Sequence, residues 1–290
     1  MSQRIVKYSR AEKIMDMTES LLADFTADGY AVARGLFDLE EVDRLRDHFM
    51  GLRRRGPYAH DLSGVRVDRR DPLRRYPRMA QMHRWDQTSL RWLLDVRLRS
   101  RLSVLAGAEP YAVQTMFYFK PPGSRGQALH QDNFYLRAEP GTCLAAWMAV
   151  DAADEANGCM QVVPGSHRWP VLCTTEADTT ISFTDVTVPL PAGQNVVPVL
   201  MNAGDVLFFN GSLVHGSTPN STTDRFRRAL IGHYIQGDAR QVAAYYHPAL
   251  RMDGTPLHLD ISEGGGVCGE WTPDGGIVST GRHTMSRKHE

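Results

Sequence analysis

The sequence contains few cysteines and few lysines, and each shortage excludes a class of protein. Its four cysteines, Cys143, Cys159, Cys173 and Cys268, show no CxxC spacing. Scattered thiols are typical of free cysteines in a reducing compartment, so we expect neither a structural disulfide nor a cysteine metal site. Only four of the 33 basic residues are lysine. This arginine bias is typical of a GC-rich genome and favours a bacterial source.

The chain also lacks net charge and any long apolar run. Lys+Arg and Asp+Glu balance at 33 each, so no overall field attracts a polyanion and we expect no nucleic-acid partner. No stretch approaches the roughly 18 apolar residues that a membrane helix needs, and the opening MSQRIVKYSR lacks the apolar centre of a signal peptide. These absences predict a cytoplasmic protein that does not span a membrane.

The length and composition predict one elaborated domain. A chain of 290 residues, 42% hydrophobic and 23% charged, can bury one substantial core. We expect a mainly helical N-terminal support over residues 1–110, a β core over 111–236 and a C-terminal extension over 237–290. Residues 173–195 and 251–290 either close over a site as lids or stay loose surface segments, and from Gly281 onward we expect disorder.

Helical patterns fill the first third of the chain. Asp38 precedes Glu41 by three residues, and apolar residues then recur at helical spacing, which predicts a helix that opens with a capping box. A second amphipathic pattern covers residues 90–106 and ends at Gly107, as helices often do. Residues 29–33 predict a short strand entered through a glycine turn.

From residue 112 the pattern changes to short segments rich in Val, Phe, Tyr and Trp, separated by Pro, Gly and Asn. The predicted strands are 112–119, 144–150, 160–163, 196–200, 206–209 and 228–235. Short strands without intervening helices indicate an antiparallel sandwich or barrel rather than a parallel sheet. The fold class is therefore mainly β, with flanking helices.

A His-x-Asp tripeptide and a later histidine carry the metal chemistry. On a strand, side chains two residues apart point to the same side, so His130 and Asp132 would present a nitrogen and a carboxylate oxygen to one point. His215 follows an apolar strand and precedes two small residues; the alternative is a capped core histidine. Two imidazoles and one carboxylate with open positions beside them suit Fe(II) better than tetrahedral zinc.

Three arginines after His215 compete for a carboxylate-binding role. Arg225, Arg227 and Arg228 lie around the start of the next strand, where a guanidinium can form a bidentate pair with a dicarboxylate co-substrate. Ser217 can add a hydroxyl to the same carboxylate.

Two other histidines are less suited to bind metal. His167 lies in a Pro-Gly turn, where a structural role is expected. His233 shares the strand face of Arg227, and we expect a packed core histidine there, with support of a metal ligand as the alternative.

The chain resembles the phytanoyl-CoA dioxygenase family through blocks that occur in the family's order over roughly residues 20–236. The blocks are His130-Gln131-Asp132, Leu144-Ala145-Ala146-Trp147, residues 157–167, Gly204-Asp205-Val206-Leu207-Phe208-Phe209, and His215-Gly216-Ser217 followed by Phe226-Arg227-Arg228-Ala229. The resemblance implies a double-stranded β-helix, a cupin-like jelly-roll barrel, with iron at its open end. It also implies Fe(II), 2-oxoglutarate and dioxygen as the reagents of an oxygenase.

The resemblance further implies a co-substrate site. In the family, an arginine that matches Arg227 anchors the far carboxylate of 2-oxoglutarate. Further contacts are implied at Ser217, Trp147, Gln131, Gln114 and Met116. Barrel packing is the alternative for Met116 and Trp147. Lys120 shares the strand face of Met116, but we expect the inward-facing set to end at Tyr118.

The substrate is expected to be a polar small molecule. Its contacts are expected at Tyr118, His83, Trp85, Asn133, Phe134 and Tyr135, a mixture of aromatic rings and amides that suits polar groups. Because Asp132 is intact, the resemblance implies hydroxylation, desaturation or oxidative ring closure rather than halogenation. Together with the bacterial bias, this favours tailoring of antibiotics, amino sugars or amino-acid derivatives in secondary metabolism. The sequence specifies no oligomeric state.

Two rival classes of function make different predictions. A metal-binding jelly roll that hydrolyses or isomerises without oxygen has no need for Arg227. A non-catalytic binding module would be expected to lose a metal ligand, and none is missing. Only the oxygenase accounts for the ligands and the arginine together.

Overall fold

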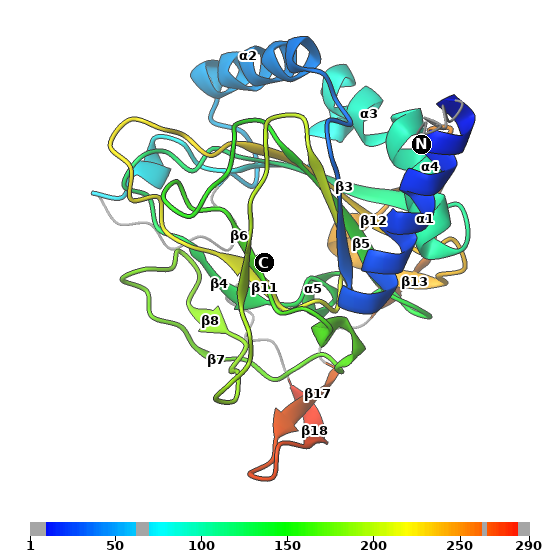
Figure 1. Cartoon of the computed structure of the whole chain (residues 1–290), viewed down its shortest axis with the longest axis vertical. Helices are drawn as coiled ribbons and strands as arrows, with labels where there is room; N and C mark the ends of the chain where they lie inside the picture. Colours follow the sequence, from blue (N-terminus) through cyan, green and yellow to red (C-terminus); the bar gives the residue numbers. More distant parts are fainter. Residues whose placement is uncertain (1–9, 62–69, 263–265, 284–290) are drawn as a thin grey trace, which may run out of the picture.

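Two β-sheets pack face to face, and helices cover the outside of the larger one (Figure 1). The computed structural model describes residues 10–61, 70–262 and 266–283. The helices are α1 (Arg10–Asp28), α2 (Leu39–Arg55), α3 (Gln87–Leu93), α4 (Val96–Ala106) and α5 (Asn133–Leu136). Single-turn 3₁₀ helices lie at Pro72–Arg74, Met82–Arg84, Ser166–Arg168 and Ala244–Tyr246. Within the described ranges, no helix is long and apolar enough to cross a bilayer.

The larger sheet has the strand order β1-β10-β5-β12-β3-β14-β15, with β2 beside β3. Its strands are β1 (Tyr30–Ala33), β2 (Met79–Ala80), β3 (Tyr111–Tyr118), β5 (Cys143–Ala149), β10 (Val206–Asn210), β12 (Ala229–Ile235), β14 (Ala249–Leu250) and β15 (Pro256–Leu257). The smaller sheet, in the order β4-β11-β6-β9, contains β4 (Gln127–His130), β6 (Met160–Val162), β9 (Val197–Val199) and β11 (His215–Ser217). The sheets form separate ladders, so this is a jelly roll without a hydrogen-bonded closed barrel.

Three strand pairs lie outside the two sheets. They are β7 (Thr175–Glu176) with β8 (Val186–Thr187), β13 (Gln241–Ala243) with β16 (Asp260–Ser262), and β17 (Gly266–Trp271) with β18 (Ile277–His283). The last pair is the hairpin that projects at the bottom of Figure 1. β18 extends past Gly281, contrary to the expected disorder from that residue, and residues 284–290 lie outside the described part of the chain.

The central strands of the larger sheet bury both of their faces. On β10, Phe208 packs toward the helices while Leu207 packs between the sheets, and on β5 Met148 and Trp147 divide in the same way. A strand buried on both faces needs apolar residues without alternation. This explains why these segments are almost continuously apolar. The six strands predicted from residue 112 onward, and the one predicted at 29–33, agree with the structure to within one residue at each end.

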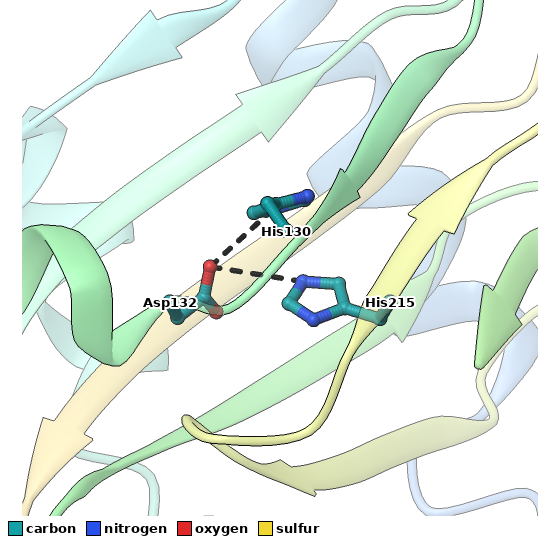
Figure 2. A group of neighbouring side chains, drawn as sticks. All are labelled: His130, Asp132 and His215. Carbon is teal, nitrogen blue, oxygen red and sulfur yellow. Dashed lines mark ion pairs between the residues drawn. The ribbon is translucent and has the colours of Figure 1, made fainter. Parts of the chain in front are cut away.

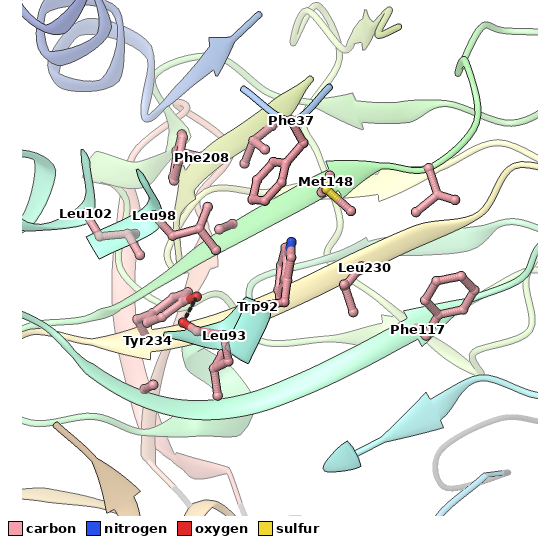
Figure 3. Close-up of a cluster of buried hydrophobic side chains, with 14 of the residues drawn as sticks. Phe37, Trp92, Leu93, Leu98, Leu102, Phe117, Met148, Phe208, Leu230 and Tyr234 are labelled. Carbon is pink, nitrogen blue, oxygen red and sulfur yellow. Dashed lines mark hydrogen bonds between the residues drawn. The ribbon is translucent and has the colours of Figure 1, made fainter. Parts of the chain in front are cut away.

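The helical layer forms the largest core against the outer face of this sheet. Figure 3 shows Leu93, Leu98 and Leu102 of α3 and α4 meeting Leu230 and Tyr234 of β12. The Tyr234 hydroxyl is buried, and it donates to the Leu93 carbonyl at 2.8 Å, so a helix end is tied to the sheet by a satisfied polar contact. This packing holds β12, which carries functional side chains on its other face.

The predicted helices are confirmed, with one correction. Asp38 accepts from the Glu41 amide at 2.8 Å, and the reciprocal bond completes the capping box of α2. The pattern over 90–106 was wrong as one helix, because the chain leaves helical geometry at Leu94 and Asp95 then caps a new helix through the Arg97 amide at 2.8 Å. An aspartate that bonds local backbone favours a helix start over a helix interior.

The prediction that no disulfide forms was wrong. Cys173 and Cys268 are bonded, across a sequence separation of 95 residues, whereas Cys143 and Cys159 are free and buried. The bond joins the insertion after β6 to the C-terminal hairpin, whose β17 also bridges Leu172 through Gly269. Cysteine spacing along a sequence does not show which distant segments the fold brings together, so this pair had no signal in the pattern.

Candidate metal and co-substrate site

Three buried side chains converge between the two sheets. His130 ends β4, Asp132 directly precedes α5, and His215 opens β11 (Figure 2). Asp132 Oδ1 lies 3.5 Å from His130 Nε2 and 3.7 Å from His215 Nε2. One ligand atom from each lies within 4.8 Å of the others, which is the separation expected of donors around a single ion.

The local geometry differs from the strand that the tripeptide predicted. β4 ends at His130, and Asp132 has helical backbone angles of φ −63° and ψ −33°. The alternation argument was therefore wrong in detail. The side chains converge because β4 pairs with β11, which sets His215 opposite His130, and because the turn into α5 brings the carboxylate back toward both rings.

Backbone carbonyls fix the tautomers of both histidines. His130 Nδ1 donates to Ala128 O and His215 Nδ1 donates to Leu213 O, each at 2.9 Å. With the proton held on Nδ1, the lone pair of Nε2 is directed to the site on both rings. This is the protonation pattern that a divalent metal requires of neutral imidazole.

The electrostatics of the cluster agree with the same reading. Burial, reinforced by His130, lowers the pKa of His215 to about 4, so the imidazole is neutral at pH 7. Burial alone would raise the pKa of Asp132, but His215 and His233 outweigh it and hold that pKa well below its usual range. The cluster therefore offers the neutral Nε2 of His215, the Nε2 of His130 whose tautomer Ala128 O fixes, and one carboxylate. This donor set fits Fe(II).

His233 supports the carboxylate. Its Nε2 lies 3.1 Å from Asp132 Oδ2, the oxygen that does not face the two histidine ligands. The expectation of a simple packed core histidine was therefore wrong, and the alternative, support of a ligand, agrees with the contact. A donor on the second oxygen fixes the orientation of the first.

Replacing His233 by leucine, which has no hydrogen-bond donor, is expected to lower Fe(II) affinity by about tenfold or more, which is the usual cost of losing a group that orients a ligand. Anaerobic titration with Fe(II) would measure it. The matched control is His167→Leu, because His167 packs against Gly29 in the turn before β1. Equal losses in both variants would contradict the role of His233.

Arg227 is a buried cation that has no carboxylate partner within the described part of the chain. It is 2% exposed, and its Nε donates to Gly158 O at 2.9 Å. Its guanidinium lies over the Trp147 ring, 5.3 Å from the centroid. Burial lowers its pKa to about 10, so it stays charged at pH 7. Among the described residues none forms an ion pair with it, and its two Nη groups are open to a bidentate acid.

The two neighbouring arginines are already paired. Arg228 binds Asp151 through Nε and Nη2 at 2.7 and 2.6 Å, and Arg225 binds Asp154 through both Nη groups at 2.6 and 3.1 Å. Arg228 is thus directed to Asp151, whereas Arg227 is directed to Trp147. Of the three candidates, Arg227 is the one that fits a dicarboxylate.

Four other residues were expected to contact the co-substrate. Met116 and Trp147 pack in the core between the sheets, and Ser217 follows His215 on β11. Gln114 is buried on β3, opposite His233. These four stay candidates for contact with a bound acid or for the wall around it.

The expectation for Gln131 is corrected. Its Nε2 donates to Ser212 O and Pro170 O at 2.7 and 3.2 Å, and its Oε1 accepts from Leu172 N at 2.7 Å. Both amide protons are therefore used on backbone groups. Gln131 anchors the ligand turn to neighbouring loops and does not present its amide to the co-substrate.

Four of the expected substrate residues lie near the ligands. The Tyr135 ring lies 6.3 Å from that of His130, and burial, helped by Asp132, raises its pKa to about 12. Phe134 packs on Tyr135 at 5.1 Å, and Asn133 Oδ1 is buried with no hydrogen-bond partner from the residues that the structure describes. The Tyr118 hydroxyl accepts from Arg78 at 3.1 Å. This group combines aromatic surface with polar atoms.

The other two expected substrate residues were assigned wrongly. His83 bonds Thr115 Oγ1 at 3.0 Å, and Thr115 points to the face of β3 opposite Gln114 and Met116. Trp85 stacks on Tyr58 at 4.7 Å and is 47% exposed. Both therefore belong to the helical layer outside the larger sheet.

Sequence reasoning missed several groups at the site. Gln127 places its Nε2 3.1 Å from His130 Nε2, and its position three residues before the first ligand was the available signal. Tyr246, from the C-terminal extension, lies close enough for Asp132 to help raise its pKa, after burial. Lys120, excluded from the inward set, is fully buried beside Ser217.

The comparisons with known proteins identify a family. The family model for phytanoyl-CoA dioxygenase (PhyH) matches residues 25–229. The chain is 31% identical to phytanoyl-CoA dioxygenase 1 of Oryza sativa over 158 residues, 53% of this chain and 55% of that one. It is 24% identical to the peroxisomal phytanoyl-CoA dioxygenase of Bos taurus over 250 residues, 81% and 73% of the two chains. The chain spans about half the length of the plant relatives that it matches.

A solved structure shows the same likeness in three dimensions. The epimerase SnoN, in a complex with Fe3+, alpha ketoglutarate and nogalamycin RO, superimposes with a TM-score of 0.62 at 25% identity, covering 78% of this chain and 86% of SnoN. The carbocyclase SnoK shares the fold at a TM-score of 0.62 and 23% identity, over 77% and 85% of the two chains. Because the family model covers most of the jelly roll and its ligand positions, the chain belongs to the phytanoyl-CoA dioxygenase family of iron- and 2-oxoglutarate-dependent oxygenases.

Proposed function

We propose that the protein is an Fe(II)- and 2-oxoglutarate-dependent dioxygenase that oxidises an unactivated C–H bond of a polar small molecule. The observation that carries the proposal is the combination of two histidines with fixed tautomers and one carboxylate with a buried Arg227 that forms no ion pair among the described residues. A hydrolase or isomerase of the same shape has no use for a buried arginine with an open fork.

Each residue of the chain has a defined task in this proposal. His130, Asp132 and His215 would hold iron through Nε2, Oδ1 and Nε2, and His233 keeps the carboxylate in place. Arg227 and Ser217 bind the far carboxylate of 2-oxoglutarate, and Met116 and Trp147 exclude water around it. When bound, iron and 2-oxoglutarate supply the dioxygen activation that the side chains cannot provide. Tyr118, Asn133, Phe134 and Tyr135 orient the substrate.

The likeness to SnoN supports a role in bacterial secondary metabolism. SnoN is described as an epimerase with a nogalamycin compound bound, so a tailoring reaction on an antibiotic scaffold, an amino sugar or an amino-acid derivative is proposed here. Hydroxylation, desaturation and oxidative cyclisation all start from the same C–H oxidation. Succinate release across a panel of such compounds would identify the substrate.

Mixing the protein with Fe(II) and 2-oxoglutarate without oxygen is expected to produce the weak visible charge-transfer band of the chelate. Two buried nitrogens, Asp132 and the Arg227 fork provide the positions that both reagents need. Zn(II) in place of Fe(II) is the control, because it binds the same donors without the band. Absence of the band when iron is shown to be bound would refute the proposed function.

We also propose that residues 1–290 act as one oxygenase unit, with the C-terminal extension contributing to the pocket. Tyr246 near Asp132 supports this organisation. A cytoplasmic location stays a proposal, and the Cys173–Cys268 disulfide counts against a reducing compartment.

A further inference from the structure

Lys120 occupies an unusual place at the end of β3. It is 3% exposed, and its backbone has a positive φ of 28°, which is rare for a residue with a side chain. Two hydrogen bonds hold this conformation, because the Lys120 carbonyl accepts from the Arg227 amide at 3.1 Å and from Asn220 Nδ2 at 3.2 Å. A strained, fully buried lysine that is fixed in this way is typical of a functional position.

The ammonium group of Lys120 is surrounded by three oxygens. It donates to Ser217 Oγ at 2.9 Å, to Gly158 O at 3.2 Å and to the carbonyl of Thr218. These contacts use all three of its protons, so Lys120 has no proton left for a bound acid. Gly158 O also accepts from Arg227 Nε at 2.9 Å, so one carbonyl bridges the two cations.

These contacts determine what the Ser217 hydroxyl can do. Ser217 Oγ accepts from Lys120 Nζ at 2.9 Å and from the backbone N–H of Gln127 at 3.2 Å. An ammonium and a backbone N–H are donors only, so both acceptor positions of the oxygen are filled. The hydroxyl proton is then directed to an acceptor that the described residues do not supply.

We propose that Lys120 is a positioning residue for the co-substrate, which holds the Ser217 hydroxyl as a donor to the far carboxylate of 2-oxoglutarate and braces Arg227 through Gly158 O. This inference rests on the proposed function. Lys120 acts on the bound acid through Ser217 and Arg227 and does not contact the acid itself.

The ammonium form is the one that this arrangement needs. Burial, followed by the charge of Arg227, lowers the pKa of Lys120 well below its usual value. Three oxygen acceptors around Nζ favour the ammonium, since a neutral amine would leave one of them without a donor. A carboxylate arriving at Arg227 adds a negative charge beside both cations and favours the ammonium further.

The test compares two acids that differ only in the far group. Iron-loaded protein without oxygen is titrated calorimetrically with 2-oxoglutarate and with 2-oxopentanoate, in which a methyl replaces the far carboxylate. Lys120→Met is expected to weaken 2-oxoglutarate binding by about tenfold, as expected for losing one charge-assisted hydrogen-bond system, and to leave 2-oxopentanoate binding unchanged. Ser217→Ala is expected to have the same effects. The double variant should bind 2-oxoglutarate no more weakly than the single variant with the lower affinity.

Several outcomes would overturn the inference. Equal weakening of both acids in Lys120→Met would indicate a merely structural lysine, and additive losses in the double variant would separate Lys120 from Ser217. If Lys120→Met does not fold, Ser217→Ala is the deciding variant. If Ser217→Ala keeps the full preference for 2-oxoglutarate over 2-oxopentanoate, the hydroxyl does not bind the far carboxylate and the inference fails. If the wild-type protein binds iron but neither acid, the proposed function itself is refuted. If Lys120→Met prefers 2-oxoglutarate as strongly as the wild type does, only the role of Lys120 is refuted.

Discussion

Replacing Arg227 by alanine is expected to weaken 2-oxoglutarate binding by about 100-fold. A charged, bidentate pair with a carboxylate contributes about 2–3 kcal/mol, and each 1.4 kcal/mol corresponds to about a factor of ten in affinity. Arg227 is 2% exposed, so water cannot replace the lost donors easily. The dissociation constant measured by anaerobic calorimetry on the iron-loaded variant checks the prediction.

Arg228→Ala provides the matched control for this experiment. Arg228 follows Arg227 directly in the chain but binds Asp151. Its loss is expected to cost some stability and to leave 2-oxoglutarate affinity within about twofold, since its charge does not reach the pocket. A 100-fold loss in both variants would mean that the arginine has been chosen wrongly. The affinity for 2-oxopentanoate should be unchanged in Arg227→Ala, because that acid lacks the group that Arg227 binds.

The sequence was sufficient for the parts of the fold that rest on local pattern. The apolar strands and the capping box of α2 follow from periodicity and from local hydrogen bonding, which act over a few residues. β11 was not predicted as a strand, and β4 was predicted only through the alternation of His130 and Asp132, because both are short and form through pairing with each other. Yet these two strands carry His130 and His215.

The site shows the same division. His130, Asp132, His215 and Arg227 could be proposed from residue type and order, since their chemistry is unusual enough to be visible in the sequence. Support of a metal ligand by His233 was an alternative, but neither its partner Asp132 nor the backbone partners of Gln131 could be named, because these contacts join segments far apart in the chain. The place of the Lys120 side chain could not be predicted from its strand face, which it shares with Met116. Its direction depends on the positive φ just after the strand, which the sequence pattern does not show.

Removing the Cys173–Cys268 disulfide is expected to destabilise the folded protein by about 4.7 kcal/mol. The bond closes a loop of 95 residues, and closing a loop of that length in the unfolded chain restricts it by about that much. For a chain of 290 residues this corresponds to a fall in Tm of about 5–8 °C. Thermal unfolding of Cys173→Ala/Cys268→Ala, compared with the oxidised wild type, measures it.

The wild-type protein under reducing conditions is the control for the disulfide, and it should unfold at the same temperature as the double variant. Titration of the denatured protein should find two free thiols before reduction, Cys143 and Cys159, and four after it. Four thiols before reduction would contradict the bond.

The effect of the disulfide should also reach the turn that carries the metal ligands. Leu172, beside Cys173, donates to Gln131, and Gln131 lies between His130 and Asp132. On the hairpin side, Trp271 donates to Pro189 O at 3.1 Å and packs on Trp169 at 5.0 Å. Without the bond, amide hydrogen exchange is therefore expected to rise first in the hairpin and then at Leu172, while α2 stays protected. Unchanged amide exchange at Leu172 would show that the disulfide does not stabilise the turn that carries the metal ligands.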